Sequence, residues 1–157
     1  MSRSGPHLQG SAKGKRFTII ASQVNPAISR ALVRGATDAL RRCGASSRRV
    51  RVLWAPGAFE LPVVAARVAK SRSRPQAVIA LGALIRGQTP QYTVIAQAVA
   101  QGLEQVSVAT GVPVTFGIIV AKTVGQAKAR AGGARGNRGA EAALAALAVL
   151  RLFDRLT

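Results

Sequence analysis

The sequence predicts one α/β domain, a three-layer α/β/α sandwich around a mostly parallel sheet. Its 157 residues suit a single core, and 48% of them are hydrophobic. Short β-rich segments alternate with segments whose apolar residues recur at helical spacing, a pattern typical of right-handed β–α–β crossovers. The run 77–84 is almost entirely apolar, as in a strand that a parallel sheet buries on both faces. No internal repeat interrupts this alternation, so we expect one domain over residues 16–157.

Turn and cap residues place the boundaries of the elements. Residues 1–15 are polar and basic, and we expect a flexible N-terminal arm there. Pro26 suits the first turn of a helix that Asn25 caps and Gly44 ends. A Pro-Gly turn at 56–57 separates the second strand from the second helix, and Gly111 ends the long third helix. The predicted strands are 17–21, 49–55, 77–84 and 112–120, and the predicted helices are 26–43, 60–71, 92–110, 123–130 and 140–153.

The composition argues against several classes of protein. The single cysteine, Cys43, rules out an internal disulfide and gives no metal-binding pattern; a small residue that closes a helix is the simpler interpretation. His7 lies in the polar arm, where a lone histidine is more often solvated than functional. No apolar run is long enough to span a bilayer, and no signal-peptide core follows the basic N-terminus. We therefore expect a cytoplasmic protein without a metal site or membrane contact.

The charge is the outlier of this composition. Lys and Arg total 23 against 5 acidic residues, which gives a formal net charge of +18. Ordinary soluble domains intersperse both signs on their surface. A chain this basic is expected to bind polyanions at least nonspecifically at low salt. The acids are Asp38, Glu60, Glu104, Glu141 and Asp154.

Ligands of an open α/β sheet bind outside the carboxyl ends of its strands. Four segments qualify, namely 22–26, 55–60, 86–91 and the segment that follows Val120 as far as Gly139. None contains a dinucleotide fingerprint, a P-loop or a nucleophile elbow. The Gly-rich stretch 131–139 fits an anion site built from backbone N–H groups, Arg135 and Arg138, and it fits a plain connector equally well. The residues alone do not decide between these two interpretations.

Four long motifs accompany these segments. They are APGAFELP (55–62), ALGALIRGQTP (80–90), GVPVTFG (111–117) and RAGGARGNRGAEAA (130–143). Their order and spacing resemble those of the lumazine synthase family, and the resemblance runs from about residue 17 to residue 153. Several independent motifs in one order make a chance match implausible.

The resemblance implies an enzyme of riboflavin biosynthesis that works without a metal or an organic cofactor. The family condenses a ribitylamino-pyrimidinedione with a butanone phosphate to give 6,7-dimethyl-8-ribityllumazine, chiefly by positioning and proton transfer. The substrate-binding residues that it implies are Val24, Asn25, Ala58, Phe59, Glu60, Gln88, Thr89, Phe116 and Arg130.

The implied roles divide between two substrates. Ala58 and Glu60 would contact the ribityl chain, while Asn25 and a Phe116 from the neighbouring subunit would border the pyrimidine. The phosphate would be held by the N–H groups of Gln88 and Thr89, by the Thr89 hydroxyl, and by a charge-assisted bond from Arg130. Core packing for Phe116 and a plain surface charge for Arg130 are the alternatives.

Three residues depart from the family pattern in the pocket itself. The family places a histidine for proton transfer at the position of Gln91, and an amide cannot titrate near neutral pH. Losing a general acid–base group typically costs ~10²–10⁴-fold in rate. The family also has an aromatic residue at the position of Val24, where it stacks on the pyrimidine, and a Glu at the position of Ala129. We therefore expect catalysis to be weakened by Gln91 and Val24, while Arg130 keeps its place as a catalytic residue.

The same trend removes acids along the helices, where Lys122 and Lys128 stand in acid-poor stretches. The family forms pentamers, many of which assemble into an icosahedral shell, and the short connector 132–139 resembles that of the shell-forming members. Lys122 and Lys128 would then make the inner wall positive. The alternative function is therefore a positively charged cage that packages nucleic acid or another anionic cargo, with little or no enzymatic role. Selection for such a partner, protein engineering and an arginine-rich genome would each explain the trend.

Overall fold

The structure, a computed structural model, describes residues 10–157. Within this range the main sheet has four strands in the order β2-β1-β3-β4, and every neighbouring pair is parallel. A short antiparallel pair, β5 and β6, lies apart from it. The strands are β1 (Phe17–Ser22), β2 (Val50–Ala55), β3 (Ala77–Ile85), β4 (Val114–Ala121), β5 (Ala131–Gly133) and β6 (Gly136–Asn137). The helices are α1 (Pro26–Arg42), α2 (Leu61–Ala69), α3 (Gln91–Thr110), α4 (Val124–Ala129) and α5 (Arg138–Asp154).

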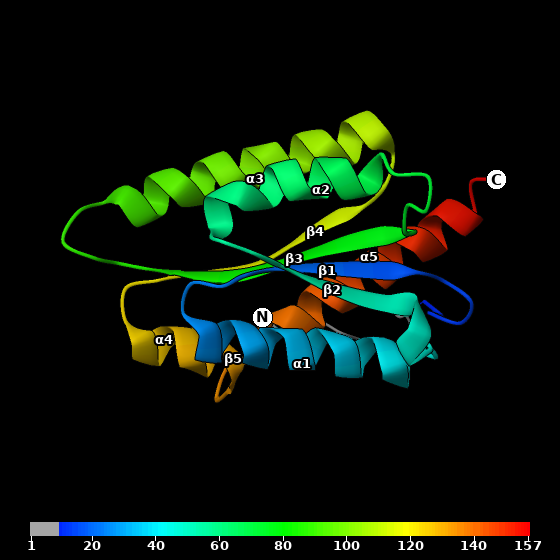
Figure 1. The fold of residues 1–157 in the computed structure, drawn as a ribbon. Coiled ribbons are helices and arrows are strands. Elements are labelled where there is room, and N and C mark those ends of the chain that lie inside the picture. The colour runs from blue at the N-terminus through cyan, green and yellow to red at the C-terminus, as the bar shows by residue number, and fades with distance from the viewer. Residues whose placement is uncertain (1–9) are drawn as a thin grey trace.

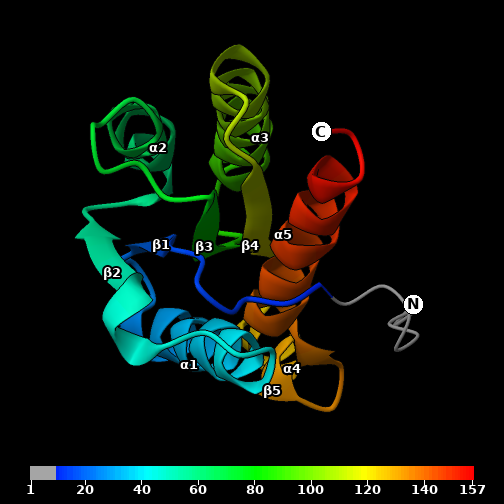
Figure 2. The ribbon, with the colours of Figure 1, turned by 90° about the vertical axis from the view of Figure 1, so that its right-hand side faces the viewer.

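The helices form one layer on each face of the sheet. Figures 1 and 2 show α2 and α3 on one face and α1, α4 and α5 on the other. Successive strand residues serve the two layers in turn, because Ile19 packs in the cluster of Leu32 and Ile20 packs in the cluster of Leu61. Each such fully buried aliphatic side chain stabilises the fold by about 1.5–3 kcal/mol. The predicted three-layer α/β/α sandwich is confirmed.

The Gly-rich stretch is the main local difference from the prediction. Instead of a loop as far as residue 139, β5 and β6 form a tight hairpin and α5 begins at Arg138. Gly132 and Gly136 have φ values of 103° and 81°, which residues with a side chain rarely adopt. The four predicted strands lie within two residues of their observed bounds, as expected where apolar periodicity sets them.

Asn25 is the N-cap residue of α1, as predicted, but its side chain does not cap the helix. Asn25 precedes α1, but its φ of 54° is left-handed and its side chain makes no cap hydrogen bond. Its Nδ2 instead donates to the carbonyl oxygen of Ala83, 3.1 Å away in β3. A long-range partner has therefore displaced the local one, which sequence position cannot reveal.

The chain is packed from residue 10 onward. Ala12 is fully buried and its N–H donates to the carbonyl oxygen of Cys43 at 2.9 Å. Cys43 itself is the C-cap of α1, as its simpler interpretation predicts. Residues 10–15 of the expected arm thus contact the domain, and its first nine residues lie outside the described ones.

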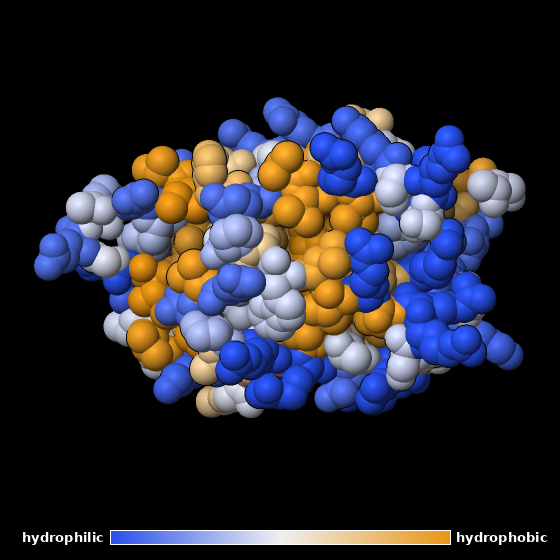
Figure 3. All heavy atoms as spheres, viewed as in Figure 1, coloured by the Kyte–Doolittle hydropathy of each residue, from blue (hydrophilic) through white to orange (hydrophobic). Residues whose placement is uncertain are grey.

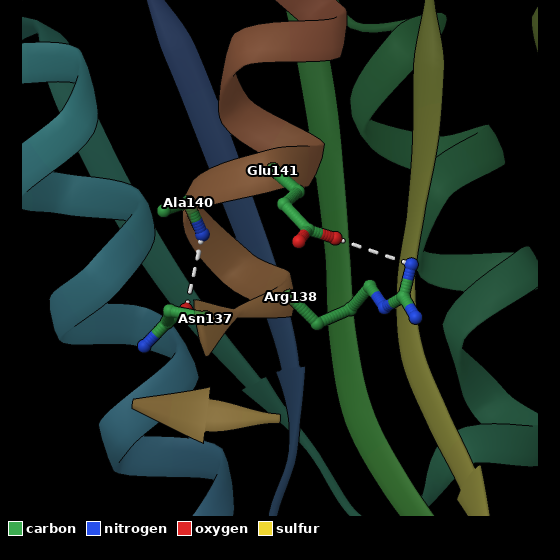
Figure 4. Close-up of polar contacts among 4 residues, drawn as sticks. All are labelled: Asn137, Arg138, Ala140 and Glu141. Carbon is green, nitrogen blue, oxygen red and sulfur yellow. Dashed lines mark hydrogen bonds and ion pairs between the residues drawn. The ribbon is translucent and has the colours of Figure 1, made fainter. Parts of the chain in front are cut away.

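Glycines allow α1 and α5 to cross closely. A Cβ on Gly139 would overlap the carbonyl oxygen of Leu32, and a Cβ on Gly35 would overlap the Asn137 side chain. Asn137 occupies this contact: its Oδ1 accepts from the N–H of Ala140 (Figure 4), and its Nδ2 donates to the carbonyl oxygen of Ala31, both at 3.0 Å. One amide therefore caps α5 and ties it to α1.

Replacing Gly139 with alanine is expected to lower the free energy of unfolding by about 2–3 kcal/mol, because the added methyl meets backbone that cannot move aside. Urea denaturation followed by circular dichroism measures this change. Gly125→Ala in α4 is the matched control, since its Cβ would come no closer than 3.9 Å to a neighbouring heavy atom. That control should stabilise the helix by up to about 1 kcal/mol. Equal effects of the two substitutions would contradict the packing argument.

Candidate functional site

The carboxyl ends of all four strands meet at one edge of the sheet, on the left in Figure 1. In the strand register Ser22 lies beside Ala55, and Ile85 lies beside Ala121. Two hydrogen bonds continue the pairing past the strands: Gln23 N–H donates to the Ala55 carbonyl oxygen and Arg86 N–H to that of Ala121, each at 2.9 Å. The predicted ligand-binding segments therefore leave the sheet side by side.

The side chains of Val24 and Glu60 both lie next to Gly57. A Cβ built on Gly57 would lie 3.0 Å from Glu60 Oε2 and 3.8 Å from Val24 Cγ2, so both side chains border the space that this glycine leaves open. Glu60 ends the 3₁₀ turn η3 (Ala58–Glu60), where Ala58 is buried and Phe59 is 65% exposed. The Glu60 carboxylate is half-buried and forms no hydrogen bond or ion pair with the described residues. Its oxygens are thus available to a ligand that donates hydrogen bonds.

Two buried serines hold the backbone of Val24. The Val24 N–H donates to Ser22 Oγ at 3.1 Å, and Ser29 Oγ donates to the Val24 carbonyl oxygen at 3.2 Å. Ser22 and Ser29 are almost fully buried, whereas the Val24 side chain is 50% exposed. Sequence reasoning missed these serines; a polar residue inside the apolar stripe of the first helix was the available signal.

The loop between β3 and α3 carries Gln88 and Thr89, Gln91 follows it, and all three residues are exposed. Gln91 is the first residue of α3 and thus directly follows the loop. The N–H groups of Gln88 and Thr89 donate to none of the described residues. Free N–H groups in an exposed loop are suited to bind an anion.

Two predicted site residues lie apart from this group. Phe116 pairs with Ala80 in the first half of β4, five positions before Ala121, and is therefore about 16 Å from the carboxyl end of its strand. Its ring is 41% exposed. Arg130 follows α4 on the α1 side of the sheet and is exposed, without a hydrogen bond or ion pair to Gln88 or Thr89. One chain therefore brings together Val24, Asn25 and Glu60, and leaves Phe116 on another surface.

Hydrogen bonds within the protein favour the connector interpretation of 131–139. The N–H groups of Arg135 and Arg138 donate at 2.8 Å to the carbonyl oxygens of Ala129 and Arg130. The Arg138 guanidinium forms an ion pair with Glu141 at 3.2 Å (Figure 4). Two N–H groups and one guanidinium that an anion could use are thus already engaged within the protein.

A hollow of about 430 Å³ that sequence reasoning missed lies beside the same edge. It is lined by Gln23, Pro26, Arg30 and Trp54. Trp54 belongs to β2, which is one of the two edge strands of the main sheet, so this residue stays 41% exposed. Strand order is a tertiary property, and a single strand sequence does not reveal which strand lies at the edge.

Residues 10–157 hold no cluster of three or more His, Cys, Asp or Glu side chains that could bind a metal ion. Over the same range no helix is both long and apolar enough to cross a bilayer.

The fold is that of an open α/β protein, a class whose ligands bind at the carboxyl ends of the parallel sheet. The family model for 6,7-dimethyl-8-ribityllumazine synthase matches residues 14–154. The chain is 48% identical over 143 residues to the 6,7-dimethyl-8-ribityllumazine synthase of Gemmatimonas aurantiaca, covering 91% of this chain and 87% of that protein. Proteins with the same description from Chlorobium phaeobacteroides and Desulfatibacillum aliphaticivorans are 48% and 46% identical over 127 residues, which is 81% of each chain. The chain belongs to the 6,7-dimethyl-8-ribityllumazine synthase family, which confirms the resemblance seen in its motifs.

Proposed function

We propose that this chain condenses a ribitylamino-pyrimidinedione with a butanone phosphate to form 6,7-dimethyl-8-ribityllumazine. The observation that carries the proposal is the unpartnered Glu60 carboxylate facing Val24 across Gly57, beside the exposed loop of Gln88 and Thr89. Two adjacent binding positions of different chemistry fit two different substrates. Family membership over residues 14–154 supports the same reaction.

The residues present would act mainly by positioning. Glu60 accepts hydrogen bonds from ribityl hydroxyls, and the N–H groups of Gln88 and Thr89 bind the phosphate. Arg130, which lies apart from that loop within one chain, would add its charge-assisted bond from a neighbouring subunit of the proposed oligomer. Holding both substrates at neighbouring loops removes most of the entropy cost of their encounter.

Catalysis is proposed to be weak because of two substitutions. Gln91 can hydrogen-bond but cannot exchange a proton near neutral pH, so proton transfers would depend on water. Val24 offers a small aliphatic surface where a flat ring would stack on the pyrimidine. Binding chemistry is thus better preserved than proton transfer.

A turnover assay with both substrates tests this proposal. Product should form at a slow rate that depends on both substrates and on enzyme concentration, above a parallel reaction without enzyme. No product at high enzyme concentration would exclude the synthase activity for this chain.

We also propose that the chain forms a homo-oligomer, with pentamers assembled into a shell and Phe116 at the subunit interface. Val108, which is 76% exposed, lines an open hollow between α3 and β4 together with Thr115, and Phe116 of β4 is itself 41% exposed. Beside them, the hydroxyl of Thr115 is buried without a hydrogen-bond partner among the described residues. Exposed apolar side chains with an unpaired polar atom favour a surface that a second subunit covers.

Replacing Phe116 with aspartate is expected to dissociate the oligomer, because a buried unpaired carboxylate costs several kcal/mol per interface. Light scattering coupled to size-exclusion chromatography would show the mass falling toward that of the 16.2 kDa chain. Phe59→Asp is the control, since Phe59 is also exposed but lies in η3. An unchanged mass for Phe116→Asp would contradict the assignment.

Packaging of anionic cargo is the second candidate function, favoured by 23 basic residues against 5 acidic ones. Particles purified at low salt should carry nucleic acid, seen as a raised ratio of absorbance at 260 nm to that at 280 nm. Particles free of nucleic acid under those conditions would count against this function.

A further inference from the structure

Basic side chains gather at the opposite edge of the sheet, where the strands begin. Figure 3 shows hydrophilic side chains massed at this end of the molecule, on the right. They come from three segments: the one that enters β1, the one from the last turn of α1 to β2, and the one between α2 and β3. We name this surface the basic amino edge; it comprises Lys13, Lys15, Arg16, Arg41, Arg42, Arg48, Arg49, Lys70, Arg72 and Arg74.

Hydrogen bonds join the three segments into one surface. The Arg16 guanidinium donates to the Arg74 carbonyl oxygen at 3.2 Å, and the Arg49 guanidinium donates to that of Gly14 at 3.3 Å. Strand pairing adds to this, because Phe17 of β1 lies between Val50 and Ala77. Four basic residues from two separate segments also line one open hollow of about 430 Å³. They are Lys15 and Arg16, before β1, and Arg72 and Arg74, between α2 and β3. Asp154 is an acidic residue on the same hollow.

Helix dipoles explain only part of this cluster. Arg41 and Arg42 lie in the last turn of α1, where a positive charge is favourable. Arg48 lies in the turn before β2, and Arg72 and Arg74 lie beyond the end of α2, so no helix end accounts for them. Their mutual repulsion lowers stability unless an anion neutralises it.

The composition of the edge fits phosphate groups. Most of its charges are guanidinium groups, whose fork of N–H donors matches phosphate oxygens. Exposed serines lie next to these arginines in SSRR (46–49) and SRSR (71–74), and serine hydroxyls also bind phosphate oxygens. The segments 41–51 and 70–76 contain no aromatic residue on which a base could stack, and Phe153, 39% exposed, is the aromatic residue that lines the hollow beside them. Their exposed side chains include no large hydrophobic one that would insert into a membrane.

We propose that the basic amino edge binds the sugar–phosphate backbone of nucleic acid independently of base sequence. The proposal rests on the second candidate function and places its binding surface at this edge, rather than at a wall formed by Lys122 and Lys128. It is independent of the synthase reaction, whose residues lie at the carboxyl edge.

Fluorescence anisotropy with a labelled, unstructured single-stranded oligonucleotide at several salt concentrations tests the proposal. The edge variant combines Arg42→Gln, Arg48→Gln and Arg72→Gln, three exposed side chains without hydrogen bonds to the described residues. The matched control combines Arg34→Gln, Lys122→Gln and Lys128→Gln, which removes the same charge elsewhere. The edge variant should weaken binding on the order of 100-fold near 0.1 M salt and reduce the slope of log K against log salt by about 2, because each lost phosphate contact removes about 0.7.

The outcomes separate this proposal from the function on which it rests. No binding by the unchanged protein would reject the second candidate function and the edge together. Equal losses in the two variants would reject the edge alone, and so would a larger loss in the control. Dependence on base sequence, or tighter binding to vesicles of anionic phospholipid at matched phosphate, would overturn the assignment to a nucleic-acid backbone. Circular dichroism and particle mass must match the unchanged protein for both variants.

Discussion

Replacing Gln91 with histidine is expected to raise the turnover number by about 10²–10⁴-fold, the usual contribution of a positioned general acid–base group. Gln91 begins α3 and is exposed, so an imidazole fits there without repacking the core. Glutamine can orient a water molecule but holds no proton that leaves near neutral pH. Turnover assays at saturating substrate measure the gain.

The pH profile distinguishes proton transfer from a general improvement of the site. Histidine titrates near pH 6.5, so the variant should gain an inflection in that region that the unchanged protein lacks. Gln91→Asn is the control and should gain neither rate nor inflection. A faster Gln91→His variant with a flat profile would show that the gain comes from shape, and an unchanged rate would place proton transfer elsewhere.

Apolar periodicity was sufficient to predict the architecture. The two central strands, β1 and β3, are largely apolar because the parallel sheet buries both of their faces, and the helices between the strands follow from spacing and glycine or proline boundaries. The layers then follow, since each helix must cover one face. Strand order does not follow in the same way, and Trp54 is exposed only because β2 lies at the edge.

Local signals failed where a distant partner competes. Asn25 has the position and chemistry of a helix cap, but its amide reaches Ala83 in β3. Asn137 lies in a stretch that the sequence leaves open between an anion site and a connector, and its amide donates to the distant carbonyl oxygen of Ala31 in α1. Each of these contacts joins segments far apart in the chain, so neither is written in the residues around it.

The arrangement of the candidate site was likewise only partly predictable from the sequence. Motif matching placed Val24 and Glu60 in one site, and the structure brings them to one glycine. It also named Phe116, which a single chain leaves about 16 Å from the edge along β4. A site shared between subunits is therefore incomplete in one chain, and the oligomer is part of the proposed chemistry.

Replacing Glu60 with alanine is expected to raise the KM of the pyrimidine substrate by about 10²-fold or more, because hydrogen bonds to a charged acceptor contribute about 1.5–3 kcal/mol each and the carboxylate has room for two. The KM of the phosphate substrate should change little, since that substrate is bound by a different loop. Glu60→Gln keeps one acceptor oxygen without the charge, so its KM for the pyrimidine substrate should fall between those of the unchanged protein and Glu60→Ala. Steady-state kinetics with each substrate varied in turn separate these effects.

Asp38→Ala is the matched control for the Glu60 prediction. It also removes one acid, from an exposed position on α1, and raises the net charge by the same amount. If both variants weaken the pyrimidine substrate equally, the charge of the whole protein governs binding and Glu60 holds no special position. If Glu60→Ala alters both KM values together, the carboxylate supports the edge as a structure rather than the ribityl chain. A selective loss for one substrate is what the open oxygens of Glu60, facing Val24 across Gly57, require.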